Sequence, residues 1–142
     1  MILPDANLLL YAYDEGSPFH AKAKPWLETL LSGDEEVGFC TVTVFAFVRI
    51  ATNKRAYEHP LRITEAAKYV RAWLAAPCAC LVSFTEADSL RALTLLEQAG
   101  TGGNLTTDAQ IAASALRLQA TVHTADTDFA RFRVQWLNPL VV

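Results

Sequence analysis

Residues 108–124, DAQIAASALRLQATVHT, join an amphipathic helical pattern to a short run of β-forming residues. The apolar side chains recur at helical spacing and predict a helix over 108–118 with one buried stripe. This stripe consists of Ile111, Ala112, Ala115 and Leu116. The run 121–124 favours a strand, because valine and threonine fit a pleated, half-buried surface. A helix that leads directly into a strand is typical of α/β proteins.

The rest of the chain shows the same alternation. Helices are predicted over 19–31, 64–75 and 86–99, and strands over 1–3, 37–40, 80–84 and 134–137. The apolar segment 37–50 is much longer than the usual strand of about five or six residues. We therefore divide it into a strand and a helix that begins at Thr41 or Thr43. Because parallel strands need crossover connections, the alternation predicts an α/β fold with a parallel sheet covered by helices on both faces.

Size and composition restrict the class of protein. The chain has 142 residues, of which 52% are hydrophobic and 19% charged. We expect a single domain over 1–142 and exclude a disordered chain. The apolar runs are too short to span a bilayer and the N-terminus lacks the pattern of an export signal, so we expect no membrane association. An odd number of cysteines, 3, argues against a disulfide framework and favours the cytoplasm.

Four aspartates stand at predicted junctions between strands and helices. Asp5 follows the first strand, and Asp108 opens a helix. Asp126 and Asp128 follow the fourth strand. In parallel sheets, ligands bind beyond the carboxyl ends of the strands, and carboxylates that converge there repel one another unless a cation lies between them. Oxygen ligands favour Mg²⁺ or Mn²⁺. The alternatives are a helix cap for Asp5, a favourable first-turn charge for Asp108 and an ordinary turn for the other two.

The net charge of the chain says less about its function than the positions of the four aspartates do. A net charge of −3 gives no basic footprint for a protein that binds nucleic acid without specificity. A cation bound among carboxylates would reverse the local field without changing that sum. The acidic balance therefore does not exclude a nucleic-acid substrate at the aspartates.

Three segments contain these aspartates in order. They are LPDANLLLYA at 3–12, GNLTTDAQIAA at 103–113 and TADTDFARF at 124–132, with NPL at 138–140 closing the chain. Together they resemble the PIN domains of the VapC-like toxin group. The resemblance implies a PIN-like three-layer α/β/α sandwich with a five-stranded parallel sheet. It also implies a metal-dependent endoribonuclease, the toxin of a type II toxin–antitoxin pair, which hydrolyses RNA and leaves 3′-hydroxyl and 5′-phosphate ends.

The resemblance gives particular residues a role. Asp5, Asp108 and Asp126 are expected to be catalytic, and together with Asp128 to bind Mg²⁺ or Mn²⁺. Around them, Thr124 is expected to place a water or a carboxylate. Asn7 and Asn104 are expected to bind a base edge or a water, with roles in helix entry and turns as the alternative.

Two basic groups are candidates for contacts to RNA phosphates, with solvated surface positions as the alternative. They are Arg49, Lys54 and Arg55 after the third helix, and Arg131 and Arg133 after the acidic turn. The expected partners are a cognate VapB-like antitoxin, the RNA substrate and a second copy of the chain in a homodimer.

One position departs from the family pattern. PIN domains commonly have a glutamate three residues before an arginine on the third helix, where this chain has Ala46 before Arg49. Alanine cannot bind a metal, which leaves a second metal and the usual water activation open unless Glu35 or Asp14 substitutes. The alternative function is a catalytically impaired PIN scaffold that binds RNA or a protein partner. A phosphatase of the haloacid dehalogenase kind is disfavoured, because its paired aspartates follow the first strand.

Overall fold

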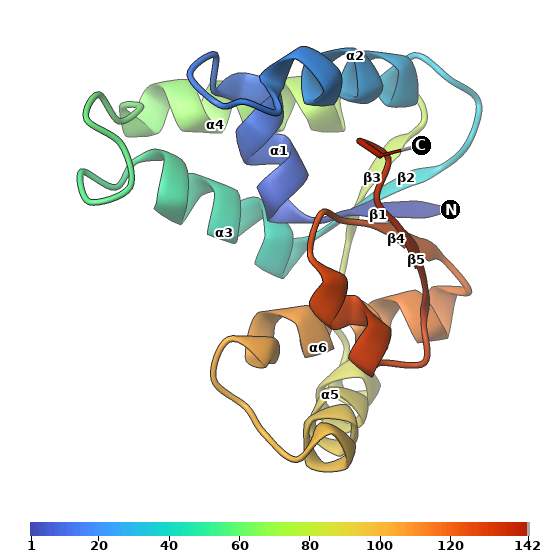
Figure 1. Ribbon diagram of the computed structural model, residues 1–142. Coiled ribbons are helices and arrows are strands. Elements are labelled where there is room, and N and C mark those ends of the chain that lie inside the picture. Colours follow the sequence, from blue (N-terminus) through green and yellow to red (C-terminus); the bar gives the residue numbers. More distant parts are fainter. Residues whose placement is uncertain (142) are drawn as a thin grey trace.

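A computed structural model describes residues 1–141 of the chain (Figure 1). Its strands are β1 (Ile2–Pro4), β2 (Val37–Cys40), β3 (Ala79–Val82), β4 (Thr121–His123) and β5 (Gln135–Leu137). They form one sheet in the order β3-β2-β1-β4-β5, and every pair is parallel. The predicted α/β class and the five-stranded parallel sheet are confirmed. Val142, the last residue of the predicted domain, lies outside the described residues.

Helices cover both faces of this sheet. They are α1 (Ala6–Tyr13), α2 (His20–Leu31), α3 (Thr41–Ala51), α4 (Ile63–Leu74), α5 (Glu86–Ala99) and α6 (Leu105–Leu118), with a short 3-10 helix η1 (Thr127–Arg131). In Figure 1, α1 to α4 form the upper layer and α5 and α6 the lower layer. The predicted three-layer sandwich is therefore confirmed. Within residues 1–141, no helix is both long and apolar enough to cross a membrane.

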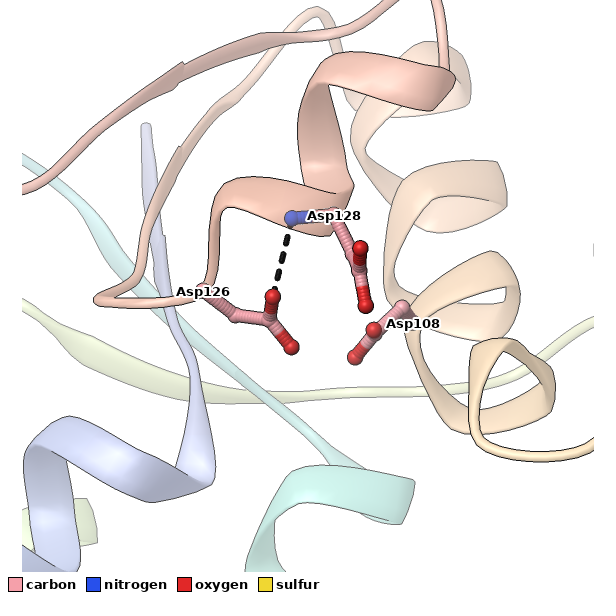
Figure 2. Close-up of side chains that lie close together, drawn as sticks. All are labelled: Asp108, Asp126 and Asp128. Atoms are coloured by element: carbon pink, nitrogen blue, oxygen red, sulfur yellow. Dashed lines mark hydrogen bonds between the residues drawn. The ribbon is translucent and has the colours of Figure 1, made fainter.

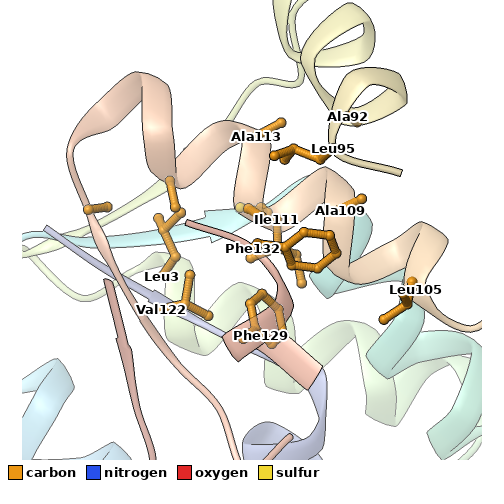
Figure 3. Close-up of a cluster of buried hydrophobic side chains, with 14 of the residues drawn as sticks. Leu3, Ala92, Leu95, Leu105, Ala109, Ile111, Ala113, Val122, Phe129 and Phe132 are labelled. Carbon is orange, nitrogen blue, oxygen red and sulfur yellow. The ribbon is translucent and has the colours of Figure 1, made fainter. Parts of the chain in front are cut away.

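Two separate apolar cores hold the three layers together. In the lower core, Leu3 and Val122 of the sheet pack with Ile111 of α6 (Figure 3). In the upper core, Phe39 of β2 stacks on Trp73 of α4 with ring centroids 5.8 Å apart. Full burial of each such side chain contributes about 1.5–3 kcal/mol to stability. The lower core is the one that positions the site described below.

Some boundaries differ from the prediction. Helix α6 begins at Leu105 rather than at 108, because Leu105 is itself buried in the lower core. Strand β3 ends at Val82 rather than at 84, and the residues that follow are exposed. Helix η1 was not predicted, because only Phe129 within it is buried and a single buried residue gives no periodic pattern.

Candidate active site

The carboxyl ends of β1 and β4 bring together segments far apart in the sequence. Parallel pairing sets Pro4 opposite His123. The ladder then continues by one bond, since the backbone N–H of Asp5 donates to the carbonyl of His123 over 2.9 Å. Asp5 and Thr124 therefore leave the sheet side by side, although 119 positions separate them in the sequence.

Asp5 is buried and is held by neutral donors. Its Oδ1 accepts the backbone N–H of Ala6 over 2.7 Å. This hydrogen bond caps α1, as the helix-cap alternative for Asp5 predicted. Its Oδ2 accepts the Thr124 hydroxyl over 2.7 Å and the Asn7 amide over 3.3 Å. Burial raises the pKa of the Asp5 carboxyl, and the hydrogen bonds from Thr124 and Ala6 only partly offset that effect. Capping therefore accounts for one of its two oxygens.

The segment after β4 turns into η1 and presents two carboxylates. The backbone N–H of Asp126 donates to Thr124 Oγ1 over 2.9 Å. Asp126 Oδ1 in turn accepts the N–H of Asp128 over 2.8 Å, the dashed line in Figure 2. Phe129 is fully buried and packs edge-on against Phe132 at a centroid distance of 6.1 Å (Figure 3). These apolar contacts fasten the turn to the lower core, while Asp128 stays exposed.

Helix α6 brings a third carboxylate to the same place. Asp108 lies in the first turn of α6 and is only 7% exposed. In Figure 2 its side chain lies together with those of Asp126 and Asp128. One carboxylate oxygen from each of these three residues lies within 4.8 Å of the others, and we call this set the acidic group. Two oxygens bound to one Mg²⁺ are at most about 4.2 Å apart, so the observed spread is only slightly wider.

The acidic group has no counter-charge of its own. The pKa of Asp108 is raised to about 7, first because burial disfavours the charged form and then because Asp5, Asp126 and Asp128 repel it. Within residues 1–141, no lysine or arginine forms a salt bridge with any of the four. A divalent cation would relieve this repulsion, and carboxylate oxygens are its preferred ligands. The residues present therefore fit Mg²⁺ or Mn²⁺.

Asp5 lies at the border of the acidic group rather than inside it. Its oxygens are not part of the set within 4.8 Å. Its charge nevertheless raises the pKa of Asp108, so the two carboxylates are close enough to interact. The predicted set of four ligands is thus arranged as three convergent carboxylates with a fourth, hydrogen-bonded one beside them.

Comparison with known proteins identifies the family. The profile of the PIN domain matches residues 2–135. The chain belongs to the PIN domain family. Ribonuclease VapC33 of Mycobacterium tuberculosis is 42% identical over 141 residues, which is 99% of either chain. The resemblance to VapC-like PIN-domain ribonuclease toxins predicted from the sequence is therefore confirmed.

Solved structures share the fold of this PIN domain. FitAcB from Neisseria gonorrhoeae superposes with a TM-score of 0.72 over 100% of both chains, at 22% sequence identity. A toxin-antitoxin complex from Klebsiella pneumoniae contains a chain that superposes with a TM-score of 0.66, covers 98% of each chain and is 18% identical. At such identities the likeness concerns the architecture, and the site must be argued from this chain's own residues.

The position of the usual PIN-domain glutamate is buried and apolar in this chain. Ala46 of α3 is 8% exposed and offers no ligand. Glu35 lies before β2, at the opposite end of the sheet, where it pairs with the amino terminus over 3.7 Å. Asp14 ends α1 and accepts the N–H of Gly16. Neither residue belongs to the acidic group, so neither replaces the missing carboxylate.

The three predicted supporting residues differ in their placement. Asn7 donates to Asp5 Oδ2 over 3.3 Å and to Thr124 Oγ1 over 3.4 Å. Its own Oδ1 accepts the N–H of Ala125 over 3.4 Å, so it ties the end of β1 to the end of β4. Asn104 is exposed at the start of α6 and makes no capping hydrogen bond. Asn7 and Thr124 thus order the site, whereas Asn104 has no such contact.

The basic residues predicted to contact RNA lie in two different places. Arg49 is in the last turn of α3, about 12 Å along the helix axis from Thr41. Lys54 and Arg55 are exposed in the turn that follows, which Figure 1 shows at the end of α3 remote from the sheet. Arg131 belongs instead to η1, the helix that carries Asp128. Only Arg131 shares an element with the acidic group.

A third buried aspartate, besides Asp5 and Asp108, was not predicted from the sequence. Asp88 of α5 is 1% exposed and accepts Arg117 Nε over 2.9 Å and the Ser114 hydroxyl over 3.3 Å. Burial alone would raise the pKa of Asp88, but hydrogen bonds from Arg117 and from the backbone of Thr85 outweigh it and lower that pKa. The pair fastens α5 to α6, the helix of Asp108. Its only sequence signal was the capping box from Thr85 to Asp88.

Proposed function

We propose that this PIN domain is a metal-dependent endoribonuclease and acts as the toxin of a type II toxin–antitoxin pair. The observation that carries the proposal is the acidic group, whose oxygens converge within 4.8 Å although Asp108 and the pair Asp126 and Asp128 come from separate segments. Ribonuclease VapC33, which matches the chain over 99% of its length, is named for the same activity.

Asp108, Asp126 and Asp128 would hold Mg²⁺ or Mn²⁺. When bound, the cation lowers the pKa of water and neutralises charge on the phosphate oxygens. Asp5 is buried at the border of this group, where its carboxylate can orient a water by accepting a hydrogen bond. Hydrolysis adds this water across the phosphodiester bond and leaves a 5′-phosphate and a 3′-hydroxyl end.

Thr124 keeps the two acidic segments in register. Its hydroxyl donates to Asp5 Oδ2 over 2.7 Å and accepts the backbone N–H of Asp126 over 2.9 Å. A single buried hydroxyl therefore links the end of β1 to the turn that presents Asp126 and Asp128. Loss of this link would let the carboxylates drift apart, and displacement of catalytic groups by about 1 Å can cost on the order of a hundredfold in rate. Thr124 is thus a positioning residue.

The proposal includes the partners and the compartment. A VapB-like antitoxin is supported by the structural relative from Klebsiella pneumoniae, which was solved as a toxin-antitoxin complex. We also include the RNA substrate and a homodimer. Near Ala125, the residue before Asp126, a hollow of 450 Å³ is lined by Tyr11 and Phe19 and offers an apolar surface to an antitoxin segment. Free Cys40, Cys78 and Cys80 suit the cytoplasm.

The test is cleavage of RNA by purified, antitoxin-free protein in Mg²⁺, in Mn²⁺ or in EDTA. We expect cutting with either metal and none in EDTA. Asp126→Asn should abolish cutting, and its remaining side-chain oxygen can still accept the N–H of Asp128 and preserve the turn. Asp34→Asn, an equal charge change at an exposed position before β2, should cut like the wild type. Cutting that survives in Asp126→Asn would indicate a contaminating nuclease and contradict the proposal.

A catalytically impaired PIN scaffold is the second candidate function. Ala46 favours it, because this buried position lacks the carboxylate that PIN domains commonly have. Such a scaffold would bind RNA or a protein partner without cutting. Saturable RNA binding by the wild type, with no cleavage in either metal, would favour this function over the first.

A further inference from the structure

Three hollows adjoin one another on the lower layer. Their volumes are 410, 610 and 320 Å³, and they lie between α5, α6 and the segment that follows η1. Arg133 lines all three hollows. Gln98 lines the first two, and Leu116 lines the last two. Because neighbouring hollows share lining residues, they adjoin one another, and we call the three together the arginine groove.

The arginine groove is basic although the whole chain is acidic. Arg91, Arg131 and Arg133 line it, and none of its lining residues is an aspartate or glutamate. All three arginines are exposed, and none forms a salt bridge within residues 1–141. Guanidinium groups bind phosphate through paired hydrogen bonds, so the groove suits a ligand with several phosphates.

The rest of the lining combines neutral polar side chains with apolar ones, among them Leu90, Leu95 and Leu116. Thr94 and Gln98 come from α5, Gln119 follows α6, and Gln135 begins β5. Hydroxyl and amide groups can bind sugar hydroxyls and base edges without adding charge. Three arginines with no carboxylate among the lining residues fit a nucleic-acid strand better than an apolar peptide.

The groove reaches η1, the helix that carries Asp128 of the acidic group. Asp128 and Arg131 are three residues apart in η1, and in a 3-10 helix such side chains lie on the same side, about 6 Å apart along the axis. Arg131 is held there because its Nη2 donates to the carbonyl of Ala99, at the end of α5. From Gln98 the groove then follows α5 for about two turns to Arg91.

We propose that the arginine groove binds the backbone of the single-stranded RNA substrate on one side of the cleaved bond. Arg131, Arg133 and Arg91 contact its phosphates in that order, moving away from the acidic group. This inference rests on the proposed ribonuclease function and adds a path for the substrate that extends well beyond the cleaved phosphate. It adds Arg91 to the contacts that the sequence already suggested at Arg131 and Arg133.

The test measures RNA binding by anisotropy in the Asp126→Asn background, so that the strand stays intact. The probe is a fluorescein-labelled single-stranded RNA of about 20 nucleotides, long enough to exceed one such groove. We expect Arg91→Ala/Arg133→Ala to weaken binding about tenfold near physiological salt, and to reduce the slope of log affinity against log salt by about 1.4, as expected for two lost phosphate contacts. The loss should be smaller for a tetranucleotide.

Two further variants separate a groove from a general charge effect. Lys68→Ala/Arg71→Ala removes the same charge from α4, on the upper layer, and should leave the salt slope within the error of the wild type. Arg91→Lys/Arg133→Lys keeps the charge but loses the paired hydrogen bonds, and should bind with intermediate affinity. Equal losses in the two alanine pairs would overturn the inference. So would unchanged RNA binding in Arg91→Ala/Arg133→Ala, including the case in which that pair loses a protein partner instead.

Different experimental results would overturn the arginine groove and the proposed ribonuclease function. If the wild type cuts RNA in a metal-dependent way but Arg91→Ala/Arg133→Ala binds it as tightly as before, the groove is wrong and the ribonuclease stands. If the wild type never cuts RNA but its binding depends on Arg91 and Arg133, the ribonuclease is wrong, and the groove binds RNA that is not a substrate.

Discussion

Two buried aspartates of the lower layer, Asp88 and Asp108, have opposite electrostatic surroundings. Their exposed fractions are similar, at 1% and 7%. Asp88 pairs with Arg117 over 2.9 Å, and hydrogen bonds outweigh burial to lower its pKa. Asp108 faces three other carboxylates, and burial together with their repulsion raises its pKa to about 7. Asp88 thus has a positively charged partner within residues 1–141, whereas Asp108 has none.

This difference separates a structural carboxylate from one that fits a ligand. Burial of an unpaired charge is costly, so a chain selected for stability alone would pair Asp108 or replace it. The acidic group instead keeps an unbalanced negative charge at the carboxyl ends of the strands. We infer that its counter-charge comes from outside, as a divalent cation.

The largest expected effect is the loss of activity in Asp108→Asn. Removal of a residue that only hydrogen-bonds a metal ligand typically costs roughly 10- to 100-fold in activity. Because Asp108 would bind the metal itself, we expect the cleavage rate to fall by more than this. The metal-free variant should unfold at a higher temperature than the wild type at neutral pH, because the repulsion is gone. Single-turnover RNA cleavage and thermal unfolding measure the two effects. A lower unfolding temperature together with full activity would contradict the assignment.

The next effect concerns Asp88 and has the opposite sign for stability. Asp88→Asn leaves Arg117 without its partner carboxylate, and we expect the free energy of unfolding to fall by about 2 kcal/mol. Urea unfolding measures this change. Mn²⁺ should stabilise the variant by as much as it stabilises the wild type, because the acidic group is intact. Unchanged stability would mean that the ion pair does not hold α5 to α6.

The stability of the metal-free protein should depend on pH through Asp108. The folded pKa of Asp108, about 7, lies above its ordinary value of 3.8, and the pKa of Asp5 is raised too. The folded state therefore retains protons that the unfolded chain releases. This contribution to stability is complete below about pH 4 and is lost as the pH rises through about 7. Thermal unfolding in EDTA should show a decline that Asp108→Asn flattens. An equally steep decline in the variant would contradict this origin.

The smallest effect is expected at Asp128. It is the exposed member of the acidic group, where solvent screens its charge, so Asp128→Asn should reduce the cleavage rate only about tenfold. Its backbone N–H still caps the turn through Asp126 Oδ1. Cleavage at increasing Mn²⁺ concentrations measures the effect, and excess metal should restore part of the rate. A loss as large as that of Asp108→Asn would show that burial does not rank these ligands.

The layers of the fold could be predicted because most helices have apolar side chains at helical spacing and the strands are short apolar runs between them. The stripe that includes Ile111 and Ala115 indicated α6, and the short run around Val122 indicated β4. Helix η1 gave no such pattern, since its position depends on Phe129 entering a core formed by distant segments. The sequence around Phe129 does not show those contacts.

The candidate site could be predicted in its residues but not in its arrangement. Strand ends and the family resemblance indicated Asp5, Asp108, Asp126 and Asp128. That three of them converge while Asp5 is held aside by Thr124 depends on the pairing of β1 with β4. The ion pair between Asp88 and Arg117 depends likewise on how α5 packs against α6. Spacing in the sequence shows neither.

Calorimetric titration of metal-free protein with Mn²⁺ tests the central claim most directly. The wild type and Asp88→Asn should both bind the ion in a saturable way near neutral pH, with protons released as Asp108 loses the one it holds at its raised pKa. Asp108→Asn should bind far more weakly. The absence of saturable binding in the wild type, or binding of equal strength in Asp108→Asn, would contradict the claim that the acidic group holds the cation.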